Sequence, residues 1–234
     1  MGARPEPSLE EAALAALRIE RTSTAERLAD RLRDLMVQGV LKPGSPLREQ
    51  PMVDALGVSR NSIREAFRLL AREGLVTHEM HKGVVVKRLH AGDIRDIYRT
   101  RALLEPLAVR QPTNPVVVAQ LAVCVTEAER AHADNDWETV GTCDLRFHRL
   151  IVSLLDAQRI SDAFEAVLVE LRLAFAEVED PGAFYGPFVP RNRRLLELLE
   201  AGQRDDCALE LLVYLREAEA RLLEVFAVAD GSAP

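Results

Sequence analysis

The sequence predicts a mainly α-helical protein, with an N-terminal winged helix-turn-helix and a C-terminal all-α bundle of antiparallel helices. Hydrophobic residues make up 48% of the 234 residues but aromatic residues only 5%, with Leu and Ala abundant, which favours helices. Two short β-branched runs, near residues 75–77 and 84–86, predict the wing, and from Asp93 onward the periodicity is helical. The length suffices for two domains, each with its own core.

The most informative segment runs from Gly57 to Arg68 and predicts a helix with two chemically different faces. The buried face consists of Ile63, Ala66, Phe67 and Leu70, and the polar face of Arg60, Asn61, Arg64 and Arg68. Ser59 is a suitable N-cap, and Gly74 ends the helix after Glu73. Such a helix suits the DNA major groove, where each bidentate Arg–guanine pair gives roughly 1–3 kcal/mol of discrimination. A solvated amphipathic helix is the alternative.

The flanking segments favour DNA binding. Helices are predicted over residues 24–38 and 49–56, and Gly57 makes the tight turn into the recognition helix. Downstream, two β-strands bracket Met80-His81-Lys82-Gly83, which predicts a hairpin with a basic tip. Three helices and a basic wing within about seventy residues form a winged helix-turn-helix.

These residues carry a family resemblance. The run GVLKPGSPLRE…LGVSRNSIREAFRLLAREGLVTHEMHKGVVV resembles the N-terminal domain of the GntR family of bacterial transcription regulators over most of residues 24–88. The resemblance implies that Ser59, Arg60, Asn61, Ser62 and Arg64, with His81, Lys82 and Gly83 at the wing tip, contact DNA. We add Arg48, Gln50 and Arg68 to the predicted DNA-binding residues. Gln50 stands where some members carry Arg, and Asn61-Ser62 replaces Thr-Pro or Thr-Thr, so the operator sequence does not transfer.

Charge is distributed unevenly along the chain. Residues 21–90 hold 13 Lys and Arg against 8 Asp and Glu, whereas residues 91–234 hold 15 against 25, and the net charge is −7. A basic N-terminal module on an acidic C-terminal one keeps the DNA-binding surface local. We predict a mobile N-terminal arm at 1–20, a DNA-binding domain at 21–90 and a helical effector-binding and dimerisation domain at 91–230.

Cysteine usage and hydropathy indicate a cytoplasmic protein that does not enter a membrane. Cys124, Cys143 and Cys207 are far apart and form no CxxC motif, which favours reduced thiols over a disulfide framework. Neither a signal peptide nor an apolar run near eighteen residues is visible.

The C-terminal region is predicted to contain six helices and one loop. The predicted helices are 93–110, 115–134, 136–156, 159–179, 188–201 and 204–228, with Asp93 as a cap and residues 180–187 as a loop. Polar residues on the apolar faces of these helices are the candidates for a ligand site, because a buried charge costs several kcal/mol unless it is paired or binds a metal. They are Arg101, Asp144, His148, Asn192 and Tyr214, which come from four helices and are predicted to converge on one cavity.

A second resemblance covers residues 93–225 more diffusely. The runs IRDIYRTRALLEPLA, DLRFHRLIVSLLDAQRI and RNRRLLELLEAGQRDDCALELLVYLREAEARLLE resemble the effector domain, called FCD, of the FadR subgroup of GntR regulators. Many members bind a divalent metal through one Asp and three His, and the metal or nearby Arg residues receive a carboxylate effector. Asp144 and His148 match the first two ligands, whereas Asn192 and Tyr214 stand at the other two positions.

The occupant of this pocket stays open at this point. One reading is a divalent metal (Zn, Ni or Mn) at an incomplete site of Asp144, His148 and Asn192. A second is a metal-free pocket, as in acyl-CoA-sensing members, in which Asp144 and His148 form a hydrogen-bonded pair and Arg101, Asn192 and Tyr214 bind an organic anion. A polar core network without a ligand is the third.

The leading hypothesis is a transcription regulator, a repressor, that binds an inverted repeat of double-stranded DNA as a homodimer and responds to a small organic acid. A metal-dependent enzyme built on Asp144 and His148 is less favoured, because no HExxH, GxSxG or Gly-rich phosphate loop is visible, and we predict no catalytic activity. A constitutive architectural DNA binder would have a solid helical core and no effector response.

Overall fold

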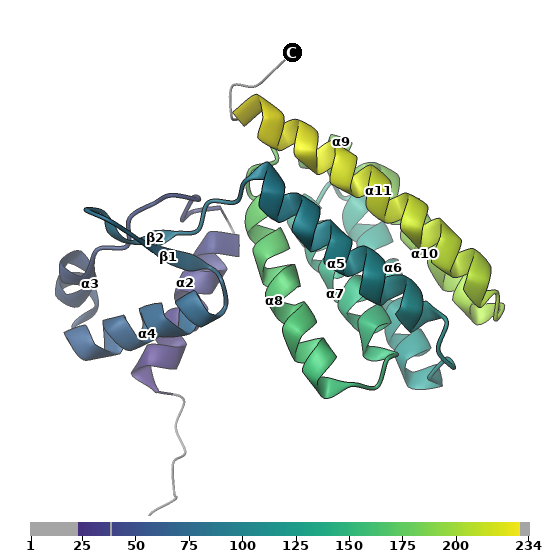
Figure 1. Cartoon of the computed structure of the whole chain (residues 1–234), viewed down its shortest axis with the longest axis horizontal. Helices are drawn as coiled ribbons and strands as arrows, with labels where there is room; N and C mark the ends of the chain where they lie inside the picture. The colour runs from purple at the N-terminus through teal and green to yellow at the C-terminus, as the bar shows by residue number, and fades with distance from the viewer. Residues whose placement is uncertain (1–22, 38, 230–234) are drawn as a thin grey trace, which may run out of the picture.

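The chain forms a small N-terminal domain and a larger helical domain, as Figure 1 shows. This computed structural model describes residues 23–37 and 39–229. The predicted arm at 1–20 and the predicted helix end at Gln38 lie outside the described residues. The mainly α-helical fold class with a two-stranded wing is confirmed.

The N-terminal domain contains three helices, α2 (Thr24–Val37), α3 (Glu49–Leu56) and α4 (Arg60–Arg72). The apolar face of α4 is buried as predicted, through Ile63, Ala66, Phe67 and Leu70. The Ser59 hydroxyl accepts the backbone N–H of Ser62 at 3.0 Å and caps α4. Gly57 ends α3 at φ 63°, a left-handed conformation that glycine adopts without steric cost, and this allows the tight turn into α4.

The wing is an antiparallel pair of strands, β1 (Val76–Glu79) and β2 (Gly83–Val86). Val76 lies opposite Val86 and Glu79 opposite Gly83, so the hairpin closes at the predicted tip. His81 lies in this tip with φ 66°, a conformation uncommon for residues other than glycine. A single bridge between Pro46 and Val85 ties the segment before α3 to the wing.

The helical domain is an antiparallel bundle. Its helices are α5 (Ala91–Val109), α6 (Pro115–Ala133), α7 (Trp137–Ser153), α8 (Gln158–Phe175), α9 (Pro181–Tyr185), the 3-10 helix η1 (Gly186–Phe188), α10 (Val189–Glu200) and α11 (Arg204–Ala229). α11 packs along α5, and α6 packs against α7 and α10. Figure 1 shows α5 and α11 side by side and α8 on the side that faces the N-terminal domain.

Two local predictions in this domain are wrong. His90, not Asp93, is the N-cap of α5, and Asp93 lies in the first turn, where its carboxylate accepts the backbone N–H of His90 at 2.8 Å. The predicted loop at 180–187 contains α9 and the start of η1. Asp180 caps α9 by accepting the N–H of Ala183 at 2.9 Å, and Pro181 opens the helix.

The three cysteines are buried and free, as expected for reduced thiols. Within the described ranges, the helices are too short or too polar to cross a membrane.

Candidate functional site

The predicted DNA-binding side chains gather on one part of the N-terminal domain, around α4, the start of α3 and the wing tip. Ser62 and Gly83 are half-buried, and the others are exposed: Arg48, Gln50, Ser59, Arg60, Asn61, Arg64, Arg68, His81 and Lys82. The N-terminal half of α4 therefore presents a polar, cationic face, as a helix that enters a DNA groove must.

The cationic side chains of this face are held by neighbouring polar groups. Arg64 Nε lies 2.9 Å from Glu49 Oε1, and Arg60 donates to the side-chain oxygen of Gln50. Lys82 Nζ at the wing tip lies 2.7 Å from Glu79 Oε2. Ion pairs at such exposed positions contribute about 0–1 kcal/mol, so phosphate groups can replace the carboxylates at little cost. Gln50 thus accepts a hydrogen bond from Arg60 across the turn between α3 and α4.

The second candidate site is a buried polar cluster in the helical domain. The structure buries all five predicted side chains: Arg101, Asp144, His148, Asn192 and Tyr214. Asp144 Oδ1 is the acceptor for both Asn192 Nδ2, at 2.9 Å, and the Tyr214 hydroxyl, at 2.7 Å. Side chains from α7, α10 and α11 therefore meet at one carboxylate oxygen.

His148 connects this carboxylate to a second one. Its Nδ1 lies 2.6 Å from Glu105 Oε2, and Arg101 Nε donates to Glu105 Oε1 at 2.7 Å. His148 Nε2 lies 3.7 Å from Asp144 Oδ1, which is beyond hydrogen-bond distance. The Asp144–His148 hydrogen bond expected for the metal-free reading is therefore wrong, and the imidazole pairs with Glu105 instead.

Sequence reasoning missed two members of the cluster, Glu105 and Tyr98. Both lie on α5 with Arg101 and are fully buried. Glu105 follows Arg101 by four residues, the spacing at which a carboxylate and a guanidinium meet on a helix. That spacing was the available signal, because a buried Arg needs a partner of opposite charge.

Electrostatics keep Arg101 and Glu105 ionised. Burial by itself raises the pKa of Glu105, but Arg101 and His148 outweigh it, and the pKa lies below the usual range. Burial likewise opposes the charge on Arg101, yet the adjacent Glu105 carboxylate raises its pKa. Burial, together with the Asp144 charge, raises the pKa of Tyr214 well above its ordinary value, so the phenol stays protonated and donates to Asp144.

Several polar atoms of the cluster lack a hydrogen-bond partner among the described residues. They are the Tyr98 hydroxyl, Arg101 Nη2, His148 Nε2 and Asn192 Oδ1. A buried polar group left unsatisfied costs about 1–3 kcal/mol, so such atoms commonly mark a position where water or a ligand binds. The Tyr98 hydroxyl and Arg101 Nη2 can donate hydrogen bonds, and Asn192 Oδ1 can accept one.

The cluster does not fit the four-ligand metal site of the FCD resemblance. In the part of the chain that the structure describes, no group of three or more His, Cys, Asp or Glu side chains lies close enough to hold a metal ion. Tyr214 is a neutral phenol whose proton is used on Asp144, and Asp144 Oδ1 already accepts two hydrogen bonds. Asp144, His148 and Asn192 supply at most three protein ligands.

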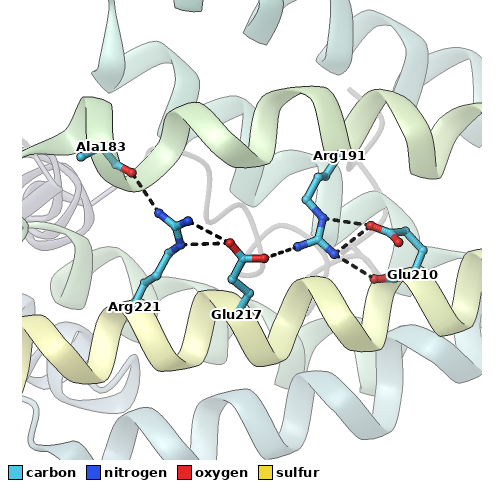
Figure 2. A network of polar contacts seen from close by, with 5 residues as sticks. All are labelled: Ala183, Arg191, Glu210, Glu217 and Arg221. Carbon is cyan, nitrogen blue, oxygen red and sulfur yellow. Dashed lines mark hydrogen bonds and ion pairs between the residues drawn. The ribbon is translucent and has the colours of Figure 1, made fainter.

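A polar network between α10 and α11 positions Asn192 and Tyr214, and Figure 2 shows it. Arg191 reaches Glu210 at 2.9 Å and Glu217 at 2.8 Å, and its guanidinium lies 5.3 Å from the Tyr214 ring centre. Because Asn192 follows Arg191 and Tyr214 lies between the two glutamates on α11, the network fixes the register that brings both side chains to Asp144.

Comparison with known proteins agrees with this architecture. Residues 24–86 match the family described as bacterial regulatory proteins, gntR family, and residues 96–217 match the FCD domain. A solved structure from Rhodococcus sp. RHA1, assigned as a GntR transcriptional regulator, is 36% identical with a TM-score of 0.80, over 86% of this chain and 97% of that one.

Curated relatives also match parts of this chain. The "probable D-xylose utilization operon transcriptional repressor" of Paenarthrobacter nicotinovorans is 30% identical over 189 residues, which are 79% of this chain and 82% of that protein. Two proteins of Bacillus subtilis (strain 168) are each 30% identical over 142 residues, or 59% of this chain. The chain spans less than two thirds of each: 63% of an uncharacterized HTH-type transcriptional regulator and 58% of the gluconate operon transcriptional repressor. With both the N-terminal and the FCD match on one chain, this protein belongs to the GntR family of bacterial transcription regulators.

Proposed function

We propose that this protein is a repressor that binds an inverted-repeat operator as a homodimer and responds to a small hydroxy acid in the buried polar cluster. The DNA contacts are assigned to α4, with Arg60, Asn61 and Arg64, and to the wing tip, with Lys82. Effector binding changes DNA affinity by the difference in effector affinity between the two arrangements of the domains.

The observation that carries the effector assignment is the set of unpartnered atoms. The Tyr98 hydroxyl and Arg101 Nη2 can donate to a carboxylate, and Asn192 Oδ1 can accept from a hydroxyl group. An acid that also carries hydroxyl groups matches this mixed set, whereas a plain hydrocarbon acid leaves the acceptor unsatisfied. The names of two relatives, which refer to D-xylose utilization and gluconate operons, support a sugar-derived effector.

The cluster is enclosed, so ligand entry requires a structural change, and this change can reach the DNA-binding domain. His148 and Glu105 are fully buried, so a ligand reaches them only when side chains or helices separate. α7, which carries Asp144 and His148, packs against α8, and α8 contacts α2 of the DNA-binding domain. Displacement of α7 would therefore alter the surface on which the DNA-binding domain rests.

The homodimer contact is assigned to the exposed apolar surface of α5 and α11. Leu103, Leu107, Leu209 and Val213 are each more than half exposed. Arg110, just after α5, pairs with Asp205 in the first turn of α11 at 2.9 Å, so the two helices run antiparallel and these four residues lie at similar heights. Apolar side chains gathered in this way are typical of an interface between subunits.

The experiment that tests the effector site compares Tyr98→Phe with Tyr185→Phe. Operator duplexes are selected from a random pool, and fluorescence anisotropy then measures DNA affinity with increasing D-gluconate and D-xylonate. Because the Tyr98 hydroxyl is unpartnered among the described residues, Tyr98→Phe should leave stability unchanged or higher and should weaken the effector response roughly tenfold. Tyr185→Phe, which removes a buried hydroxyl near the cluster that makes no hydrogen bond to Asp144, His148 or Asn192, should respond as the wild type does.

Elemental analysis of the same protein, purified without chelator or affinity metal, decides between occupants. A stoichiometric divalent ion would overturn the metal-free site and assign Asp144, His148 and Asn192 as ligands. If no hydroxy acid changes the operator affinity of the wild type, the effector assignment is overturned. The DNA-binding assignment is not affected by that result.

A further inference from the structure

A cavity lies between the two domains, apart from the buried polar cluster. Arg33 of α2 and Leu75, which precedes β1, line it from the DNA-binding domain, and α7 and α8 line it from the helical domain. Its volume is about 250 Å³. Ligand sites for drug-sized molecules occupy about 300–1,000 Å³, so this cavity suits a smaller molecule.

The wall of the cavity is mainly apolar. Leu75, Leu145, Leu168, Val169 and Leu173 form this surface, and all but Val169 are buried. Such a surface attracts a hydrocarbon group by removing it from water, with about 25 cal/mol gained for each Å² buried. A hydroxy acid, the ligand proposed for the buried cluster, would gain little here.

The polar side of the cavity is formed by Thr142, Glu165 and four arginines, and the partners of the arginines distinguish one of them. Arg33, Arg146 and Arg149 each lie within ion-pair distance of a glutamate: Glu73, Glu127 and Glu165. Arg172 has no carboxylate within ion-pair distance among the residues that the structure describes, and its Nη2 donates to the Thr142 hydroxyl at 2.7 Å. The remaining N–H groups of Arg172 are therefore available to an anion.

We propose that this cavity binds a small amphipathic carboxylic acid, with the carboxylate on Arg172 and the hydrocarbon chain on the leucine surface between the domains. A guanidinium offers a fork of N–H groups that matches the two oxygens of a carboxylate. One unpaired cation beside an apolar wall selects a single negative charge with a hydrocarbon tail, and it disfavours polyvalent acids and neutral lipids.

An occupant of this cavity contacts both domains at the point where they are joined. Lys87 Nζ, just after β2, lies 2.8 Å from Glu170 Oε2 of α8. Gly74, two residues after the end of α4, lies so close to Glu170 that a Cβ there would come within 2.7 Å of Oε1. Both ends of the segment from α4 to the wing therefore rest on α8, and a ligand beside them binds one arrangement of the domains better than others. The cavity is thus a second regulatory site, independent of the proposed hydroxy-acid site.

Isothermal titration calorimetry with octanoate tests the site on the full-length protein. Octanol carries the same chain without charge, and succinate carries charge without the chain. We expect one octanoate per chain, at least tenfold weaker binding of octanol, and no saturable binding of succinate. Saturable octanoate binding should be accompanied by a concentration-dependent rise in Tm.

Variants locate the binding site. Arg172→Gln should weaken octanoate binding roughly tenfold or more, Arg172→Lys should restore part of it, and Val169→Phe, which fills the cavity, should abolish it. Arg159→Gln, an exposed arginine on the same helix, should bind as the wild type does. Circular dichroism identifies a variant that fails to fold. If either Arg172→Gln or Val169→Phe fails to fold, octanoate binding by the other one tests the site.

Three results would overturn the proposal: no saturable octanoate binding by the wild type, equal binding of octanol, or full binding by both Arg172→Gln and Val169→Phe. Tyr98→Phe separates the two sites, because it should impair the response to hydroxy acids and leave octanoate binding unchanged. If Tyr98→Phe lost octanoate binding while Arg172→Gln bound octanoate normally, the octanoate site would be assigned to the buried cluster, and the interdomain site would be rejected.

Discussion

Glu105 Oε2 and His148 Nδ1 lie 2.6 Å apart in the centre of the helical domain, and both residues are fully buried. Arg101 neutralises the other oxygen of the same carboxylate. Glu105 is therefore the residue that makes two inward-pointing polar side chains compatible with an apolar core. It also orients the imidazole, because the hydrogen bond at Nδ1 fixes the ring and directs Nε2 toward Asp144.

Replacement of Glu105 tests its structural importance. Glu105→Gln keeps the shape but leaves the Arg101 charge without a partner, so the free energy of unfolding should fall by about 3–5 kcal/mol. Urea denaturation followed by circular dichroism measures this. Glu129→Gln is the control, because Glu129 pairs with Arg193 at a part-exposed position where a loss of about 0–1 kcal/mol is expected. Equal losses in both variants would contradict the central role of Glu105.

The pH dependence of stability should report the same carboxylate. Folding lowers the pKa of Glu105, since Arg101 and His148 outweigh the opposing effect of burial. The native state then holds fewer protons on Glu105 than the unfolded state, so its contribution is complete at neutral pH and is lost as the pH falls through the folded-state pKa. Denaturation experiments between pH 7 and pH 3 should therefore show that the free energy of unfolding falls more steeply for the wild type than for Glu105→Gln. Parallel curves would assign the acid lability to other groups.

The recognition helix gives a prediction about DNA affinity. Arg60→Ala and Arg64→Ala should each weaken specific operator binding by roughly 5- to 150-fold, the equivalent of 1–3 kcal/mol, without changing the helical content. Anisotropy on the selected operator measures the loss. Arg194→Ala, an exposed arginine of α10, is the matched control and should bind normally. Unchanged binding by both α4 variants would remove α4 from the DNA-binding surface.

The wing tip should act through phosphate groups. Lys82→Ala should weaken binding to all sequences by a similar factor and reduce the slope of log affinity against log salt by roughly 1. Titrations between low and physiological salt on the operator and on a scrambled duplex measure both effects. A loss confined to the operator would instead indicate that Lys82 reads a base.

The cysteines should be inert while the protein is folded. Burial raises the pKa of Cys143 to about 11 and that of Cys207 to about 12, so their thiolate forms are scarce at pH 8. Labelling with an aromatic disulfide reagent should be at least two orders of magnitude slower than at an introduced Gln158→Cys, which is exposed, and rapid in guanidinium chloride. Fast labelling of the native wild type would show that the helices around these thiols open readily.

Some of these features follow from local patterns in the sequence. The apolar stripe of Ile63, Phe67 and Leu70, the Ser59 cap and the turn at Gly57 depend on residues within one or two helical turns, and the structure shows each of them. The inward position of Arg101, Asp144 and His148 follows in the same way from helical spacing. The predicted cap at Asp93 failed because two alternative caps lie three residues apart, and the N-terminal context of α5 decides between them.

Which groups meet, in contrast, depends on how the helices pack. The choice of Glu105 rather than Asp144 as the hydrogen-bond partner of His148 joins residues 43 positions apart. The pairing of Tyr214 with Asp144 spans 70 positions, and the contact of Lys87 with Glu170 spans 83. Periodicity determines which side of a helix is buried, because it is a property of one helix. The partner of a buried charge and the cavity between two domains are properties of several helices together, so only the tertiary structure decided them.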